Sequence, residues 1–447
     1  MAENIHVTQA LARFVIATNY DDLPSEVVSE AKRSLLNWLG VAIGAVRHEA
    51  VDILLRLAAE TGGHATVAVF GRQERVDALN GALINGMSSH IFDFDDTHLR
   101  TVIHPSAPIA PAALALAEWK GGSPKDVLTA FVLGVEACLR IGNSVCPEHY
   151  NVGWHVTGTA GVFGSAIASS KMLGNDELAT RYAIGLAATQ AASLREMFGT
   201  MTKPYHPGKA AMDGLRSALI AGWGFTSSDQ GIEAPRGFAN VASTKFDPHE
   251  ITGSLGREWE ALKNTYKPYP CGVVIHPVID AALGLHEKGV TAENVESIVA
   301  NVHPLVQELT SKRTPRTGLE GKFSVFHCVG AAIVDGKVGQ AQFSDEKVRD
   351  STIVRVRDQT DINVTDGMRE DECHIVATLT DGRSVEHYVE FASGSLENPL
   401  SDAQLDEKFT DLVAPILGSG RADSLIGIVR DFENQPDITG LVRAATP

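Results

Sequence analysis

The chain has 447 residues, of which 44% are hydrophobic and 21% charged, and its formal net charge at pH 7 is −17. A chain of this length can bury a large core and favours two or three domains. The acidic excess argues against a nucleic-acid partner and against an anionic membrane surface. It does not exclude an anionic substrate, because a local basic pocket can lie inside an acidic shell.

The cysteines are odd in number, widely spaced and without a CxxC pair: Cys138, Cys146, Cys271, Cys328 and Cys373. This usage fits reduced thiols and excludes a zinc ribbon or a three-cysteine iron–sulfur cradle. Residues 3–9 are polar, unlike a signal peptide. The most hydrophobic stretch, 35–45, is too short to span a bilayer and contains Asn37. We expect a cytoplasmic protein with no membrane partner.

Up to about residue 260 the sequence predicts one helix after another. Apolar residues recur at helical spacing over 27–42, after Pro24. Ser123 and Pro124 are typical of an N-cap followed by the first helical residue. Ala-rich helical runs follow at 107–119, 158–173, 180–193 and 210–223. We expect residues 1–265 to form a helical domain in which small residues such as Gly158, Gly161 and Gly164 let helices approach closely.

The pattern changes after the proline-bearing junction at 266–271. Alternation predicts strands at 296–303 and 353–357, and the strands 373–380 and 384–391 flank a hairpin turn at Asp381-Gly382. Helical patterns lie at 277–288 and 322–335. We therefore expect a smaller α+β domain over residues 266–395. Helices resume at Ser401, so residues 396–447 are expected to return to the first domain, and the smaller domain is an insertion.

The densest group of ionisable residues is the stretch His90–Pro108, with three aspartates and three histidines among large apolar side chains. Charged groups are costly among apolar residues unless they are paired or used. Perturbed titratable groups concentrate at functional sites, so this stretch is the best single candidate for a reaction centre. The alternative is a helix cap with paired acids.

Further candidates lie elsewhere in the chain. His155 precedes a glycine-bearing helix whose GxxGxxG spacing follows no strand, which excludes a dinucleotide fingerprint. Lys203 lies with His206 at the opening of another helix, where a lysine can bind a carboxylate or act as a base. Lys267 flanks the domain junction. Ser324 and His327 begin a helix of the smaller domain. Each of these features also has a structural alternative, either helix packing or a solvated loop.

The chain has no P-loop, GxSxG elbow, HExxH or CxxC motif. The remaining chemistry is that of Asp, His, Lys and Thr side chains. These groups suit abstraction of a proton α to a carboxylate, with cationic groups that stabilise the enediolate-like state.

Together the clusters resemble the MmgE/PrpD family. The similar stretches occur in the family's order: HIFDFDDTH with HPSAP, GWHVTGTAGVFGSAIASSKMLG, KPYHPGKAAMDG, GFTSSDQGIEAPRGF, KPYPCGVVIHP and GKFSVFHCVGAAIVDG. The resemblance implies a mainly α fold, with a large all-helical domain formed by both termini and an inserted α+β lid domain. It also implies a homodimer, a small anionic carboxylate substrate, and no required metal or cofactor.

Carried over by position, the family's site residues are Asp93, Thr97, His104, His155, Lys203 and Lys267. We expect Lys203 to be one base, and Asp93 with His104 or His155 to serve the other face of the substrate. Lys267 and Thr97 are expected to hold substrate carboxylates, with His206, His327 and Ser324 as further substrate contacts. Asp95, Asp96 and His98 are expected to be supports or caps.

Two positions depart from the family's decarboxylases, which have a His where this chain has Gly272 and a Tyr where it has His327. Loss of those groups puts decarboxylation of cis-aconitate in doubt and favours a simpler proton exchange. The expected activity is therefore epimerisation of the iminodisuccinate type. The alternatives are a hydro-lyase similar to 2-methylcitrate dehydratase and a family member that binds a carboxylate without catalysis.

Overall fold

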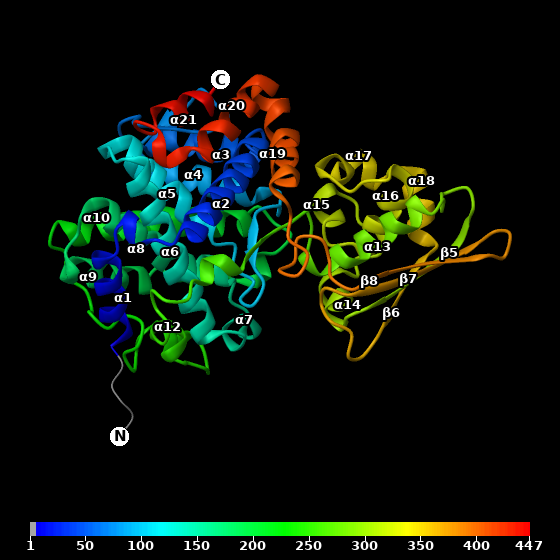
Figure 1. Ribbon diagram of the computed structural model, residues 1–447, viewed down its shortest axis with the longest axis horizontal. Helices are drawn as coiled ribbons and strands as arrows, with labels where there is room; N and C mark the ends of the chain where they lie inside the picture. The colour runs from blue at the N-terminus through cyan, green and yellow to red at the C-terminus, as the bar shows by residue number, and fades with distance from the viewer. Residues whose placement is uncertain (1–5) are drawn as a thin grey trace. The chain divides into compact units, whose positions relative to one another are not determined.

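The computed structural model describes residues 6–447, so the first five residues of the expected helical domain and part of the polar 3–9 stretch lie outside it. The chain divides into two compact units (Figure 1). Unit 1 comprises Met1–Ile91, Asp95–Asn264 and Ser401–Pro447, and unit 2 comprises Phe92–Phe94 and Thr265–Leu400. The expected fold class, a helical domain from both termini with an inserted α+β domain, is confirmed. Phe92–Phe94 was expected in the helical domain but belongs to unit 2.

Unit 1 is built almost entirely of helices. They are α1 Val7–Ala17, α2 Ser25–Gly44, α3 Glu49–Thr61, α4 Ala78–Ile91, α5 Ser106–Lys120, α6 Pro124–Val145, α7 Glu148–Val152, α8 Val156–Leu173, α9 Glu177–Ala188, α10 Thr202–Gly222, α11 Phe238–Ala242, α12 His249–Thr252, α19 Asp402–Leu417, α20 Ser419–Arg430 and α21 Thr439–Ala444. Its short strands are β1 Val67–Ala68, β2 Arg75–Val76 and β3 Asp96–His98, and β4 Asn264–Tyr266 lies at the junction.

Helix α6 lies in the core of unit 1. It begins where expected, because the Ser123 side chain accepts a hydrogen bond from the Asp126 amide and Pro124 occupies the first turn. Among the described residues, only α6 is long and apolar enough to cross a membrane, and its apolar window is wholly buried. It also carries the buried ion pair of Glu136 and Arg140, whose Oε1 and Nε atoms lie 2.6 Å apart. These features are typical of the core helix of a folded domain.

The C-terminal helices pack on the N-terminal ones within unit 1. Phe409 of α19 and Trp38 of α2 belong to the same buried core. A Cβ atom added at Gly40 of α2 would lie 2.8 Å from a ring atom of Phe409, so this contact needs a glycine. The C-terminal segment therefore returns to the first domain, as the sequence predicts.

Unit 2 is a four-stranded sheet with helices. The sheet order is β6-β5-β7-β8, with β5 and β6 parallel and the other neighbours antiparallel. Its strands are β5 Val295–Val302, β6 Thr360–Val364, β7 Cys373–Leu379 and β8 Ser384–Val389. Its helices are α13 His276–Glu287, α14 Pro304–Thr310, α15 Gly318–Gly321, α16 Val325–Asp335, α17 Asp345–Val348 and α18 Ser351–Asp358. The hairpin predicted at Asp381-Gly382 joins β7 to β8.

One predicted strand is wrong. Residues 353–357 lie inside helix α18, where Ile353 and Val356 are buried three residues apart. The Asp350 side chain caps this helix by accepting hydrogen bonds from the amides of Thr352 and Ile353. An alternation of five residues is too short to distinguish a strand from one face of a helix. Here the Asp350 cap favours the helix.

Candidate active site

The first part of the site is a carboxylate between two histidines. His90 lies in the last turn of α4, and its Nδ1 lies 2.7 Å from Asp95 Oδ2, with both side chains fully buried. His104 Nδ1 lies 3.5 Å from Asp95 Oδ1 and 2.9 Å from the carbonyl oxygen of Asp96. Carbonyl and carboxylate oxygens only accept hydrogen bonds, so each ring donates from Nδ1. A neutral ring then carries its lone pair on Nε2, which suits a general base.

The His90 Nε2 atom is buried and has no hydrogen-bond partner among the described residues. A buried polar atom of this kind usually marks a place where a ligand or water completes the pairing. Sequence reasoning did not select His90, although it lies in the stretch singled out above. The signal that could have found it is the pairing of a histidine at the end of a helix with a carboxylate in the turn that follows.

His155 and His206 form the second part. His155 precedes α8 but makes no side-chain cap; instead its Nδ1 lies 3.0 Å from Nδ1 of His206. The His155 ring stacks on that of His90, with ring centroids 5.7 Å apart. Phe198 covers it edge-on, at a centroid distance of 5.0 Å. The structure therefore brings together two predicted residues that lie far apart in the sequence.

Lys203 lies in the first turn of α10 and is 8% exposed. Its Nζ is 5.2 Å from the centroid of the Phe198 ring. Burial, and then the nearby His90 and Lys203, lower the pKa of His155 well below its usual range. Burial, and then His90, lower the pKa of His206 to about 4. Both rings are therefore neutral at physiological pH.

Glycines let the helices that carry these side chains come close. A Cβ added at Gly158 of α8 would lie 2.0 Å from Ser193 Oγ and 3.2 Å from His206 Cβ. A Cβ added at Gly86 of α4 would lie 2.9 Å from the Cα of Gly208 in α10. The prediction that small residues bring these helices together is confirmed, and the result is a shared group of buried histidines.

The neighbouring polar residues hold the turn, as expected of supports. Asp96 Oδ2 accepts hydrogen bonds of 2.6 Å from both Ser106 Oγ and Asn264 Nδ2. Burial raises the pKa of Asp96 to about 7. His98 pairs through Nδ1 with Thr101 Oγ1 at 2.8 Å. Thr97 contacts the site directly, since its Oγ1 lies 3.2 Å from Nδ1 of His104.

Within unit 2, two buried lysines hold the Phe92–Phe94 segment. Lys267 Nζ donates to Asp93 Oδ1 at 3.0 Å and to the Asp93 carbonyl at 3.1 Å. Asp93 has a φ of 53°, a conformation that non-glycine residues adopt rarely and often at functional sites. Lys322 Nζ donates to the Phe92 carbonyl at 2.8 Å, and burial lowers the pKa of Lys322 to about 7.

Ser324 and His327, predicted as substrate contacts, are engaged in local structure. The Ser324 side chain caps α16 by accepting from the His327 amide at 3.2 Å. His327 Nε2 donates to the Gln342 carbonyl at 2.9 Å, and the side chain is completely buried. The Nδ1 atom of His327 is buried without a hydrogen-bond partner among the described residues, and the role of both residues in substrate binding stays a prediction.

The donor atoms of His90, Asp95 and His104 lie within 4.8 Å of one another, so this group could also hold a metal ion. Two nitrogens and one carboxylate oxygen form a common transition-metal set. The 2.7 Å contact of His90 with Asp95, however, is a hydrogen-bond distance, and a shared proton already satisfies both atoms.

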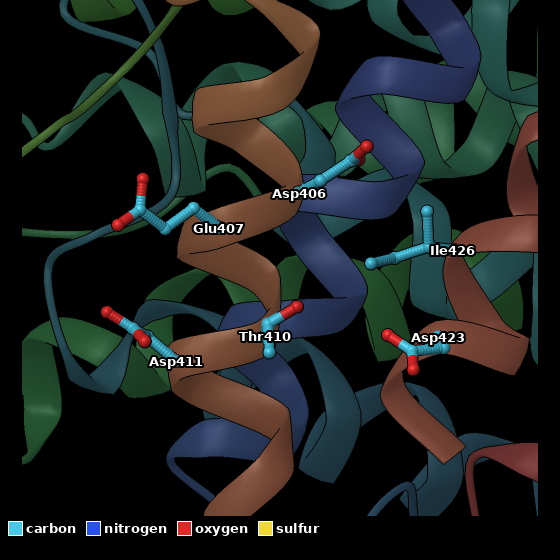
Figure 2. A pocket seen from close by; sticks show the side chains of 6 residues that line it. All are labelled: Asp406, Glu407, Thr410, Asp411, Asp423 and Ile426. Carbon is cyan, nitrogen blue, oxygen red and sulfur yellow. The ribbon is translucent and has the colours of Figure 1, made fainter. Parts of the chain in front are cut away.

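A separate hollow of about 430 Å³ lies on unit 1 (Figure 2). Its lining residues come from α19 and α20 and are Asp406, Glu407, Thr410, Asp411, Asp423 and Ile426. None of these lining residues is a lysine or arginine. Asp406 pairs with Arg430 at 2.7 Å, but the other three carboxylates repel an anionic ligand, so this hollow does not fit the expected substrate.

A buried carboxylate beside two histidines, a second pair of buried histidines and a buried lysine are typical of a site of the acid–base class. The model of the MmgE/PrpD N-terminal domain matches residues 9–251, and that of the C-terminal domain matches residues 269–434. The chain belongs to the MmgE/PrpD family.

Curated relatives align along nearly the whole chain. Cis-aconitate decarboxylase of Homo sapiens is 26% identical, over 99% of this chain and 95% of that protein. Cis-aconitate decarboxylase of Aspergillus terreus is 25% identical, over 98% of this chain and 95% of that protein.

Proposed function

We propose that this chain is a cofactor-independent enzyme that removes the proton α to a carboxylate of a small di- or tricarboxylic acid. The observation that carries the proposal is the buried group in unit 1, in which Asp95 orders His90 and the Asp96 carbonyl orders His104. This order leaves the Nε2 lone pair of His90, a buried atom with no hydrogen-bond partner among the described residues, available as a base. General bases of this kind contribute about 10²–10⁴-fold to rate.

Lys203 supplies the positive charge that this chemistry needs. The enediolate-like state that follows proton loss carries more negative charge than the substrate, and a fixed ammonium stabilises it most in a buried site. The expected role of Lys203 as a base on one face of the substrate remains part of the proposal. The two roles differ in whether the ammonium must lose its proton.

We propose epimerisation as the outcome, of the iminodisuccinate type. Gly272 and His327 stand where the resemblance implies the additional acids of the decarboxylases, so proton removal followed by proton return is the simplest reaction left. A lyase reaction is the second candidate, because relatives that align along nearly the whole chain are named cis-aconitate decarboxylases. Its dehydratase form needs an acid for a departing hydroxyl.

One experiment separates these outcomes. The full chain is incubated in heavy water with a panel of di- and tricarboxylic acids, and products are followed by NMR, chiral chromatography and mass spectrometry. Deuterium at the α-carbon with inversion and no other mass change supports the epimerase. Loss of water or of carbon dioxide supports the lyase. Binding of an acid without any exchange would make the protein a non-catalytic binder and sink the catalytic proposal.

A pair of variants tests Lys203. Lys203→Arg keeps the positive charge but cannot act as a base near neutral pH, since arginine stays protonated. Lys203→Met removes both properties at similar length. Activity retained by the arginine variant and lost by the methionine variant assigns a charge role. Loss of activity in both variants, with unchanged far-UV circular dichroism, supports Lys203 as a base. Activity retained in both variants would show that Lys203 has no part in the mechanism.

A homodimer in the cytoplasm is also proposed, as the resemblance and the cysteine usage imply. All five cysteines are buried and free. Sedimentation velocity at micromolar concentration tests the dimer, and a monomer there would contradict it.

A further inference from the structure

The contact between His155 and His206 joins two like atoms. Nδ1 of one ring lies 3.0 Å from Nδ1 of the other, and both residues lie in unit 1. A neutral imidazole has one N–H and one lone pair. A hydrogen bond at this distance therefore needs one ring to hold its proton on Nδ1 and the other to hold its proton on Nε2. The two Nε2 atoms are then opposite in character, one a base and the other an acid.

The surroundings of the two rings disfavour the binding of an additional proton, so both rings stay neutral and share one proton between their Nδ1 atoms. The side chains are 2% and 5% exposed. The ionisable groups that act on the pair are His90, His104, Lys203 and Lys209, and each disfavours a further positive charge. An imidazolium at His155 would lie buried beside these cationic or protonatable groups, and its formation is costly.

We propose that His155 and His206 act as one neutral proton relay, with His206 a positioning residue that works through His155. This inference rests on the proposed function. As His155 Nε2 takes the α-proton, the His155 Nδ1 proton passes to His206 Nδ1. The proton on His206 Nε2 then leaves to a water molecule. Each ring loses one N–H bond and gains one, so the pair stays uncharged. The reverse sequence returns a proton to the same face of the substrate carbon, and in epimerisation the proton on the opposite face comes from the base proposed there, Lys203.

The proposed relay can be tested by NMR without measuring enzymatic turnover. In the full chain labelled with ¹⁵N-histidine, His206→Asn assigns the signals of the pair by removing one ring. We expect one protonated and one bare nitrogen in each ring, and a scalar coupling between the two Nδ1 atoms across the shared proton. Two rings that both carry their proton on Nε2, or a cationic ring at neutral pH, would overturn the relay.

The same variant tests the relay in turnover. In His206→Asn the new side-chain amide can still pair with His155 Nδ1 but cannot pass a proton on. We expect α-deuterium exchange to fall by about 100-fold or more with little change in KM. Exchange should also become dependent on pH, because His155 must then carry the proton as an imidazolium. Near-normal exchange in this variant would overturn the relay.

His149→Asn is the matched control. His149 is a buried histidine of the same unit, bonded to the Ala242 carbonyl at 2.8 Å and to Thr159 Oγ1 at 2.8 Å. The His149→Asn substitution should lower stability without the pH-dependent loss of exchange. An identical kinetic change in this control would show that His206 contributes only to packing. If the unmodified chain exchanges no acid at all, the proposed function fails, while the ¹⁵N spectra still decide whether the shared proton exists.

Discussion

Asp95 Oδ2 lies 2.7 Å from Nδ1 of His90, and neither side chain is accessible to solvent. The carboxylate holds the ring proton on Nδ1, so Nε2 keeps the lone pair of a base. Asp95→Asn would present an amide N–H to Nδ1 and move the ring proton to Nε2. We expect kcat to fall by about 10²–10⁴-fold, as for other histidines that lose their orienting carboxylate.

The matched control for this variant is Asp423→Asn, which removes a carboxylate from the hollow in Figure 2. It should leave kcat and KM unchanged. Steady-state exchange kinetics check both variants. A normal kcat in Asp95→Asn would show that catalysis does not depend on Asp95 holding the His90 proton on Nδ1.

Asp96 makes stability depend on pH. Burial raises its pKa from 3.8 to about 7, so the folded state holds a proton that the unfolded chain releases. The stabilisation from this proton is complete below about pH 4 and is lost as pH rises to about 7, by a few kcal/mol at about 1.4 kcal/mol per pKa unit. Asp96→Asn lacks this dependence, so we expect its stability relative to the unmodified chain to increase between about pH 4.5 and 8.

Urea unfolding followed by tryptophan fluorescence measures this difference. Both Trp38 and Trp259 are buried in the core of unit 1, which also holds Asp96. Parallel stability curves for the two proteins across this pH range would show that Asp96 does not bind the proton.

Gly158 is expected to be intolerant of even one methyl group. In Gly158→Ala the new Cβ would lie 2.0 Å from Ser193 Oγ, so α8 and the Ser193 segment must move apart. We expect a loss of stability of about 1–3 kcal/mol, typical of overpacking, together with reduced activity because His206 lies next to the contact.

Ser193→Gly in the same chain should restore much of both losses by removing the clashing side chain. Gly427→Ala is the control, since nothing lies within 4 Å of a Cβ there and the glycine is inside α20. That substitution should be neutral or slightly stabilising. Thermal melts and exchange assays of the three variants check this set, and a stable, active Gly158→Ala would contradict it.

The buried pair of Glu136 and Arg140 predicts a large, asymmetric effect on stability. Arg140 Nε donates to Glu136 Oε1 at 2.6 Å, and Arg140 also donates to the Glu258 carbonyl at 2.7 Å. Arg140→Met leaves a buried carboxylate without its cation, at a cost of about 3–5 kcal/mol. Adding Glu136→Gln should recover part of that loss, because the remaining group is neutral. Urea unfolding measures the free energy of unfolding of the single and the double variant. Equal stability of the two variants would show that the buried Glu136 carboxylate needs no partner.

Local patterns in the sequence were enough to predict much of this protein. The capping box at Ser123, the hairpin at Asp381-Gly382 and the helical spacing of apolar residues are encoded over a few neighbours, so they are readable without a fold. The concentration of aspartates and histidines after residue 90 is likewise a local feature, and it predicts the region in which we propose the reaction centre. The short alternation at 353–357 predicted a strand, but the Asp350 side chain just before it caps a helix, and the segment is helical.

The tertiary structure decided which side chains meet. His155 and His206 are 51 positions apart, and no local rule sets the distance between a nitrogen just before α8 and one in α10. Their contact depends on how closely α8 and α10 pack, which the glycine at position 158 permits. No local pattern in the sequence indicates that Phe92–Phe94 belongs to unit 2. Local hydrogen bonding and periodicity determine the elements, whereas burial and close packing bring the histidines together and lower the pKa values of His155 and His206.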